Sequence, residues 1–233
     1  LEEAGRFYEL TEALDRENHY MIANMLSVRR SLEHANEKRR EMEKANERLL
    51  EKSETDPLTR LANRFRLNDY LERAFERTRD DHRAFAVEIL DIDYFKEYND
   101  NYGHQAGDAC IVAIADELRK MQSHDTFCAR YGGDEFIIIY EYKTEDEVFS
   151  MADSLRERIL DRRIEHVCSK ALPVVTISQG ICFDVAPEGS RSWDFLHAAD
   201  MMLYEVKKRS RNNISLGHLD AKEARYGEER KFL

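Results

Sequence analysis

Two carboxylates follow an apolar stretch at the point where a buried strand would meet solvent. The run from Leu90 to Asp93 reads Leu-Asp-Ile-Asp, and Lys96 follows within one helical turn. Carboxylates at a strand end are suited to Mg²⁺, which binds one or two of them together with substrate phosphates. Asp93 alone is equally suited to cap a helix that begins at Tyr94. The metal interpretation therefore depends on Asp91 and on a second acidic site.

That second site is the run from Arg130 to Phe136, which reads Arg-Tyr-Gly-Gly-Asp-Glu-Phe. Two glycines allow a tight turn and a close approach of backbone to a phosphate. Asp134 and Glu135 follow the turn, and side chains alternate along a strand, so we expect the two acids to point to opposite faces and to differ in role. Together with Asp91, the pattern is typical of carboxylates that hold one or two metal ions for phosphoryl or nucleotidyl transfer.

A sheet is needed to bring these residues together, and the pattern after residue 56 predicts one. Helices are expected near 63–79, 94–101, 106–122, 145–163 and 192–209. Strands are expected at Ala84–Leu90, Phe127–Tyr131, Phe136–Tyr142, Val174–Phe183 and Asn213–Leu216. Gly132-Gly133 is expected to form the two-residue turn of a hairpin. The mixture predicts an α/β (α+β) sandwich whose central sheet is mostly antiparallel and flanked by helices.

The first 54 residues contain no Pro and repeat an apolar residue at every seventh position, which is typical of a left-handed coiled coil. At about 1.5 Å per residue, residues 6–53 would span roughly 70 Å. The second seam position, four residues after each of these apolar positions, holds both polar and apolar residues, which favours a marginal, switchable coiled coil. A long surface helix folded back on the same domain is the alternative. The apolar positions are Phe7, Leu14, Met21, Val28, Ala35, Met42 and Leu49, and the residues at the second seam position are Thr11, Asn18, Met25, Leu32, Arg39 and Asn46.

Pro57 disfavours helix at the residue before it and marks a domain boundary. We expect a helical dimerisation segment at 1–54, a globular domain at 55–217 and a charged tail at 218–233. Within the globular domain, we expect Arg64 and Arg130 to brace the fold. We expect the side chains of Trp193, Phe195 and Leu196 to belong to the core.

Composition and charge exclude several classes of protein. The 233 residues are 42% hydrophobic with a net charge of −11, so the chain can bury a core but has no basic run dense enough for nucleic acid. No stretch approaches the roughly 20 apolar residues of a membrane span, so we expect no direct membrane contact here. The chain begins with Leu, and we expect a cytoplasmic fragment of a longer protein, whose full length could be membrane-tethered. We expect four reduced core thiols, Cys110, Cys128, Cys168 and Cys182.

The run around Gly132-Gly133 resembles the signature of the GGDEF family, the diguanylate cyclases. The resemblance covers residues 55 to about 217 and implies the palm-type, ferredoxin-like sheet of nucleotidyl cyclases, here preceded by a signalling coiled coil. Arg60 and Ser210 stand where Gly is frequent in the family, and both lie outside the carboxylate cluster. The matching segments are Asp56–Thr59, Asn63-Arg64, Asp91–Asp100, Gly103-His104, Gly107-Asp108, Val175–Gly180 and Ala199–Asn212.

The resemblance implies roles for the acidic residues. Asp91, Asp134 and the backbone carbonyl of Ile92 would bind Mg²⁺, with Mn²⁺ as a substitute. Glu135 would be either a further metal ligand or the group that receives the 3′-hydroxyl proton, and the sequence leaves both roles open.

The resemblance also implies a set of substrate contacts. Lys96, Lys207 and Arg211 would hold a triphosphate, and the last two, spaced i, i+4, would share one helix face. Cations near a helix C-terminus are favourable in any protein, which is the alternative reading of that pair. Asn99 and Asp108 would read guanine, because a carboxylate accepts both of the donors that guanine presents.

By this resemblance, two GTP are joined into cyclic di-GMP with release of two pyrophosphates. One domain would hold one GTP, so we expect a homodimer through the N-terminal helix, controlled by an upstream sensor domain. An inactive module that binds GTP or cyclic di-GMP and a coiled-coil scaffold are the alternatives. The Arg and Asp of the family's product-inhibition site would fall on Ser123 and Thr126, so no such site is expected.

Overall fold

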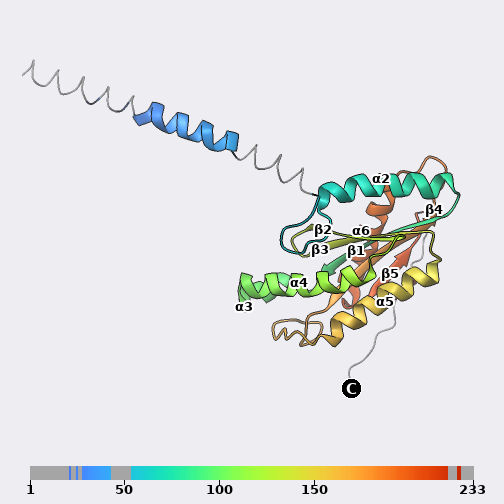
Figure 1. Cartoon of the computed structure of the whole chain (residues 1–233). Coiled ribbons are helices and arrows are strands. Elements are labelled where there is room, and N and C mark those ends of the chain that lie inside the picture. The colour runs from blue at the N-terminus through green and yellow to red at the C-terminus, as the bar shows by residue number, and fades with distance from the viewer. Residues whose placement is uncertain (1–20, 22–24, 26–27, 43–53, 220–224, 227–233) are drawn as a thin grey trace, which may run out of the picture. The chain divides into compact units, whose positions relative to one another are not determined.

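The computed structural model describes residues 21, 25, 28–42, 54–219 and 225–226. The chain divides into two compact units, Leu1–Lys52 and Ser53–Leu233. In the first unit, residues 28–42 form a helix, drawn in blue in Figure 1. Its described apolar side chains are exposed, as the seam of a coiled coil would be in a single chain. The expected seam residues Phe7, Thr11, Leu14, Asn18, Asn46 and Leu49 lie outside the described residues.

The second unit is built on a six-stranded sheet in the order β2-β3-β1-β4-β5-β6. Every neighbouring pair is antiparallel except β4 and β5, which confirms the expected mostly antiparallel sheet. The central strand β1 is buried on both faces, and its side chains alternate between two cores. The strands are β1 (Ala84–Ile92), β2 (Thr126–Gly132), β3 (Glu135–Glu141), β4 (Ile177–Val185), β5 (Ile214–Gly217) and β6 (Arg225–Tyr226).

Helices cover both faces of this sheet (Figure 1). One core joins the sheet to α2 and α6, and the other joins it to α3, α4 and α5. On β1, Val87 and Ile89 belong to the first core, while Ala86 and Leu90 belong to the second. The helices are α2 (Arg64–Asp80), α3 (Phe95–Tyr102), α4 (His104–Met121), α5 (Glu145–Asp161) and α6 (Ser192–Arg209). None of the helices in the described ranges is both long and apolar enough to cross a membrane.

The elements lie where the hydrophobic pattern predicts them, with shifted ends. β4 begins at Ile177 rather than at Val174, because Val174 forms only an isolated bridge with Glu165. Two residues of the expected tail, Arg225 and Tyr226, form β6 against β5. The division of the chain into a dimerisation segment, a catalytic domain and a tail stays a prediction.

Two expectations about the core were wrong. The side chain of Trp193 is 44% exposed, although Phe195 and Leu196 are buried as predicted. Trp193 lies two residues before Phe195, which turns it about 200° away from the buried face of α6. Cys168 is exposed because it lies in the irregular segment between α5 and β4, whereas the other three Cys are buried.

Candidate active site at the end of the central strand

The sheet places two of the predicted acidic residues side by side. Asp91 of β1 and Glu135 of β3 are directly opposite partners in an antiparallel pair. Their side chains therefore share one face of the sheet, with Cβ atoms about 4.5–5.5 Å apart. Asp134 precedes Glu135, and its negative charge acts on both of the other carboxylates. The structure thus places Asp91 beside Glu135, with Asp134 near enough for its charge to act on both.

The hairpin that carries these acids turns one residue later than predicted. Gly132 pairs with Glu135, so the turn residues are Gly133 and Asp134, and a bulge lies between Arg130 and Gly132. Gly133 has a φ of +56°, a conformation that glycine adopts at little cost. The two glycines therefore have different structural roles: Gly132 lies at the bulge and Gly133 lies in the turn.

Arg130 braces the turn, as expected. Its guanidinium donates hydrogen bonds to the carbonyl of Gly133, the shorter of them 2.8 Å, and lies 3.2 Å from the carboxylate of Asp56. Burial opposes the ionisation of Asp56, but hydrogen bonds from Thr59 and the charge of Arg130 hold its pKa below the ordinary value. The same ion pair ties the start of the second unit to the β2–β3 hairpin. Arg64, the other predicted brace, stacks on the ring of Tyr131 at 4.5 Å.

Asp91 is a buried carboxylate with a single cationic partner among the described residues. The Nζ of Lys207 on α6 lies 2.8 Å from Oδ2 of Asp91. Burial raises the pKa of Asp91 to about 6, although the ammonium of Lys207 opposes the rise. Burial also raises the pKa of Glu135, as do the charges of Asp134 and Asp200, although the charge of Lys207 opposes the rise. Both acids therefore lie in surroundings where a further positive charge would be favourable.

Asp93 has a different role from the helix cap considered above. Its fully buried carboxylate accepts hydrogen bonds from the hydroxyls of Thr176 and Ser178, both 2.7 Å, and from the backbone N–H of Asn212 at 3.0 Å. The N-cap position of α3 is Tyr94, which makes no side-chain capping bond. Asp93 thus anchors the segment after α6 to the end of β1, a role that only the fold reveals.

Arg211 belongs to that anchored segment and not to a helix. α6 ends at Arg209, and Arg211 has a φ of +53°, so Lys207 and Arg211 do not share a helix face as predicted. The guanidinium of Arg211 lies 4.4 Å from the ring centroid of Tyr94 and 3.5 Å from Asp93. Lys207 and Arg211 nevertheless both lie at the end of β1, because Lys207 contacts Asp91 and Arg211 contacts Asp93.

The predicted guanine readers lie on the neighbouring helices α3 and α4. The backbone of α4 comes close to Asn99 at Gly107, where any Cβ would overlap the side-chain oxygen of Asn99. That oxygen is buried and has no hydrogen-bond donor among the described residues. Asp108, the next residue of α4, is exposed, and so is Lys96 in the first turn of α3. The structure therefore holds Asn99 beside Gly107 with an unsatisfied acceptor.

Comparison with known proteins identifies the family of the chain. The family described as "Diguanylate cyclase, GGDEF domain" matches residues 53–213, which contain every acid and cation described above. The chain belongs to this family. Its GGDEF domain is 35% identical over 159 residues to the bifunctional diguanylate cyclase/cyclic di-GMP phosphodiesterase MucR of Pseudomonas aeruginosa, and 35% identical over 167 residues to the diguanylate cyclase DgcP of the same species.

These matches cover 67% and 71% of the chain, but only 22% and 24% of the two relatives. Among solved structures, the coiled coil and GGDEF domain of DgcB from Caulobacter crescentus, in complex with c-di-GMP, matches with a TM-score of 0.65 and 28% identity, over 82% of this chain and all of that one. The diguanylate cyclase SiaD of Pseudomonas aeruginosa, in complex with its activator SiaC, matches with a TM-score of 0.63 and 25% identity, over 93% and 84% of the two chains. The palm-type fold of GGDEF domains is thereby confirmed.

Proposed function

We propose that this GGDEF domain is an active diguanylate cyclase, which condenses two GTP into cyclic di-GMP and releases two pyrophosphates. The observation that supports this most is the meeting of Asp91, Glu135 and Lys207 beside the Gly133-Asp134 turn. The presence of both acids of the hairpin, Asp134 and Glu135, supports turnover over the inactive alternative.

The acidic residues fit a divalent cation of the kind on which diguanylate cyclases generally depend. Asp91 and Asp134 offer hard oxygen ligands, and the backbone carbonyl of Ile92 lies next to Asp91 in the chain. The described residues contain no group of three or more metal-ligating side chains. Mg²⁺ does not require such a group, because it needs one or two carboxylates and takes its other ligands from substrate phosphates and water. When bound, the ion would withdraw charge from the α-phosphate and so ease attack on it.

In this proposal, three cationic side chains bind the triphosphate of GTP. Lys207 and Arg211 are held at the end of β1 by Asp91 and Asp93, and Lys96 lies one turn into α3 with no ion pair among the described residues. Positive groups that are already positioned stabilise a polyphosphate without reorganisation when it binds. Lys207 also neutralises Asp91 in the metal-free chain.

Guanine would be read between α3 and α4. The buried oxygen of Asn99 lacks a donor, and guanine supplies one from its exocyclic amine. Asp108, one residue after the close contact at Gly107, would accept from the N1–H and the amine of the same base. Adenine presents no such pair of donors, so the arrangement favours GTP over ATP.

The site of one domain would hold one GTP, so the reaction needs two copies facing each other. Each 3′-hydroxyl would attack the α-phosphate of the other nucleotide, and Glu135 would serve as a metal ligand or as the acceptor of the hydroxyl proton. The N-terminal helix, with its exposed seam, would bring two chains together in a cytoplasmic homodimer under the control of an upstream sensor.

Incubation of the protein with GTP and Mg²⁺, followed by mass spectrometry of the products, tests the proposal. We expect cyclic di-GMP and pyrophosphate from the native chain and neither from a Glu135→Gln variant that still binds GTP. If the native chain binds GTP and releases no cyclic dinucleotide at any protein concentration, the inactive binding module is the correct reading.

A further inference from the structure

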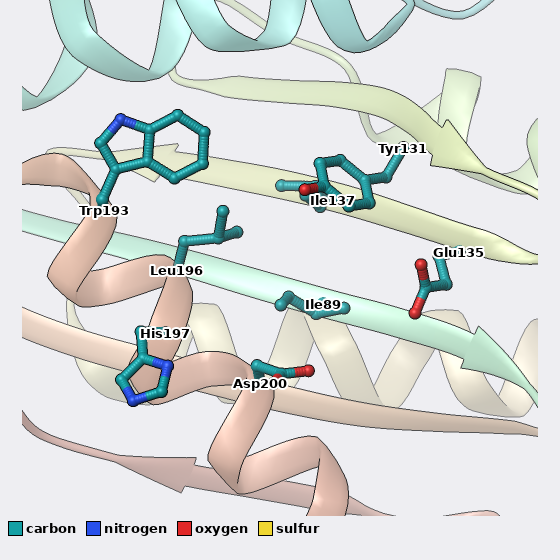
Figure 2. Close-up of a pocket in the computed structure, with 8 residues that line it drawn as sticks. All are labelled: Ile89, Tyr131, Glu135, Ile137, Trp193, Leu196, His197 and Asp200. Carbon is teal, nitrogen blue, oxygen red and sulfur yellow. The ribbon is translucent and has the colours of Figure 1, made fainter.

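A cavity of about 360 Å³ lies between β1, β3 and α6, directly beside Glu135 (Figure 2). Its size is at the lower end of the roughly 300–1,000 Å³ of small-molecule sites. The lining combines three kinds of surface. Ile89, Ile137 and Leu196 form an apolar part, Tyr131 and Trp193 add aromatic rings, and Glu135 and Asp200 add carboxylates, with His197 next to Leu196.

The two carboxylates of the cavity face each other. Figure 2 shows the side chains of Asp200 and Glu135 directed toward one another across β1, with Ile89 between them. The charge of Asp200 acts on Glu135, and neither carboxylate has a hydrogen bond or a close ion pair within the described part of the chain. Lys207, the nearest cation named above, is paired with Asp91. The charge of Lys207 also acts on Glu135, but this one ammonium faces the carboxylates of both Asp91 and Glu135, so the end of the cavity formed by Glu135 and Asp200 keeps a net negative charge that favours an incoming cation.

The aromatic residues suit the same kind of ligand. Trp193 lines the cavity and is 44% exposed, so part of its side chain is accessible to a ligand. Aromatic faces attract ammonium and guanidinium groups, and Trp does so most strongly. The ring of Tyr131 already carries one such contact, with the guanidinium of Arg64 at 4.5 Å. Rings, carboxylates and an apolar surface together favour a cation that also has an apolar body.

Other ligand classes fit this lining less well. A metal ion would use only the two carboxylates and would leave the apolar and aromatic surfaces of the cavity without a ligand. A phosphate group would be repelled by Glu135 and Asp200. A neutral apolar molecule would leave both carboxylates without a partner as it removed their water.

We propose that this cavity is a binding site for an organic cation, a primary ammonium or guanidinium group carried on a flat apolar body. The charged group binds between Asp200 and Glu135, and the apolar body lies on Trp193 and Leu196. A ligand held in this way withdraws Glu135 from the reaction, so it inhibits turnover. The inhibition rests on the proposed function, whereas the binding does not.

The fluorescence of Trp193 tests the binding directly, because it is the only Trp of the chain. The probe is 2-phenylethylamine, titrated into the full chain at constant ionic strength without GTP or Mg²⁺. Its matched control is 2-phenylethanol, which has the same shape and no charge. We expect a saturable change in emission from the amine, at a dissociation constant about tenfold lower than that of the alcohol, the ratio expected of a charge-assisted contact.

Two variants locate the cation. Asp200→Asn should weaken binding of the amine about tenfold and leave that of the alcohol unchanged. Glu205→Gln removes the same charge from α6, at a residue that pairs with Arg209 and does not line the cavity, and should change neither. Equal binding of amine and alcohol, equal effects of the two variants, or no saturable signal would each overturn the proposal.

The inhibition is measured separately. In the cyclase assay, we expect 2-phenylethylamine to lower the rate over the concentration range in which it changes the emission of Trp193, and Asp200→Asn to shift both curves together. Binding without inhibition would overturn the inhibitory role alone. A chain that makes no cyclic di-GMP would refute the proposed function and leave the fluorescence result intact.

Discussion

Asp91 and Asp93 are two residues apart, yet their carboxylates have different contacts and therefore different expected roles. Asp91 lies beside Glu135 and has Lys207 as its partner, whereas Asp93 is closed in by hydroxyl and backbone donors. A carboxylate with several fixed donors holds a loop, and a carboxylate with few can take a metal ion. In the proposed function, one aspartate therefore stabilises the scaffold and the other, two residues away, takes part in the chemistry.

Changing Asp134 to Asn should remove turnover and preserve the fold. The substitution takes away a metal ligand, but in the metal-free chain it also relieves repulsion between neighbouring acids, so the free energy of unfolding should not fall. Activity by product analysis and stability by urea titration measure the two effects. Substantial cyclic di-GMP synthesis by a folded variant would contradict the assignment of Asp134.

Glu88 offers a test of electrostatics far from the reaction. It is fully buried in β1, and burial raises its pKa to about 7, although the hydrogen bond from Tyr140 opposes the rise. The ordinary pKa is 4.5. Between these values the folded state keeps a proton that the unfolded state has lost, so the free energy of unfolding falls as the pH rises from 4.5 to 7.

Between pH 4.5 and pH 7, the free energy of unfolding of the native chain should fall by about 3 kcal/mol because of Glu88, and changing Glu88 to Gln should remove this fall. Urea titrations of both proteins at pH 5 and pH 8 measure the free energy of unfolding. The variant should become more stable relative to the native chain at the higher pH. Glu97→Gln, at an exposed position of α3, is the control and should leave the fall in place. Parallel pH profiles for the native chain and Glu88→Gln would show that Glu88 is ionised throughout.

At the scale of elements, the close contact between α3 and α4 positions Asn99. Changing Gly107 to Ala should displace that side chain, because the new Cβ would overlap its oxygen. We expect the KM for GTP to rise about tenfold with little change in kcat, as for the loss of one buried hydrogen bond to substrate. Steady-state kinetics measure both constants.

A double-mutant cycle separates this effect from general damage to α4. In an Asn99→Ala background there is no amide to displace, so Gly107→Ala should raise the KM no further. If the two substitutions multiply each other's effects, the contact at Gly107 acts through something other than Asn99.

The turn between α4 and β2 bears on feedback by product. Ser123 and Thr126 close this turn through a 3.0 Å backbone hydrogen bond, and Thr126 is buried. These positions lack the guanidinium that would bind a phosphate or a guanine edge. We expect cyclic di-GMP at micromolar concentration not to inhibit noncompetitively, which a titration at saturating GTP measures. Strong inhibition that GTP does not relieve would refute this expectation.

Much of the element order could be predicted from the sequence, because alternation and turn residues report which segments are buried. What the pattern does not report is how one segment meets another. The anchoring of Arg211 depends on contacts between the end of β1 and the segment after α6, and no local periodicity encodes them. The exposure of Trp193, by contrast, follows from helical periodicity, because Trp193 lies about 200° around α6 from the buried Phe195.

At the scale of the whole molecule, the proposed reaction needs two chains, and the N-terminal helix is the element proposed to pair them. Residues 28–42 are helical and expose Val28 and Leu32, so the helix has an apolar seam available to a second chain. Changing Leu32 to Glu should weaken pairing and make the specific activity rise steeply with protein concentration. His34→Glu, at a position outside the seam, is the control. Specific activity that is independent of concentration in all three proteins would refute dimerisation through this helix.

The exposure of Cys168 makes the native chain selectively reactive toward thiol reagents. Burial raises the pKa of the other three thiols, and the thiolate is the reactive form, so a maleimide spin label should attach first at Cys168. Each chain then carries one paramagnetic centre. In a symmetric pair of chains, dipolar spectroscopy would report a single separation, and its change upon addition of GTP would record how far the two domains move as they meet.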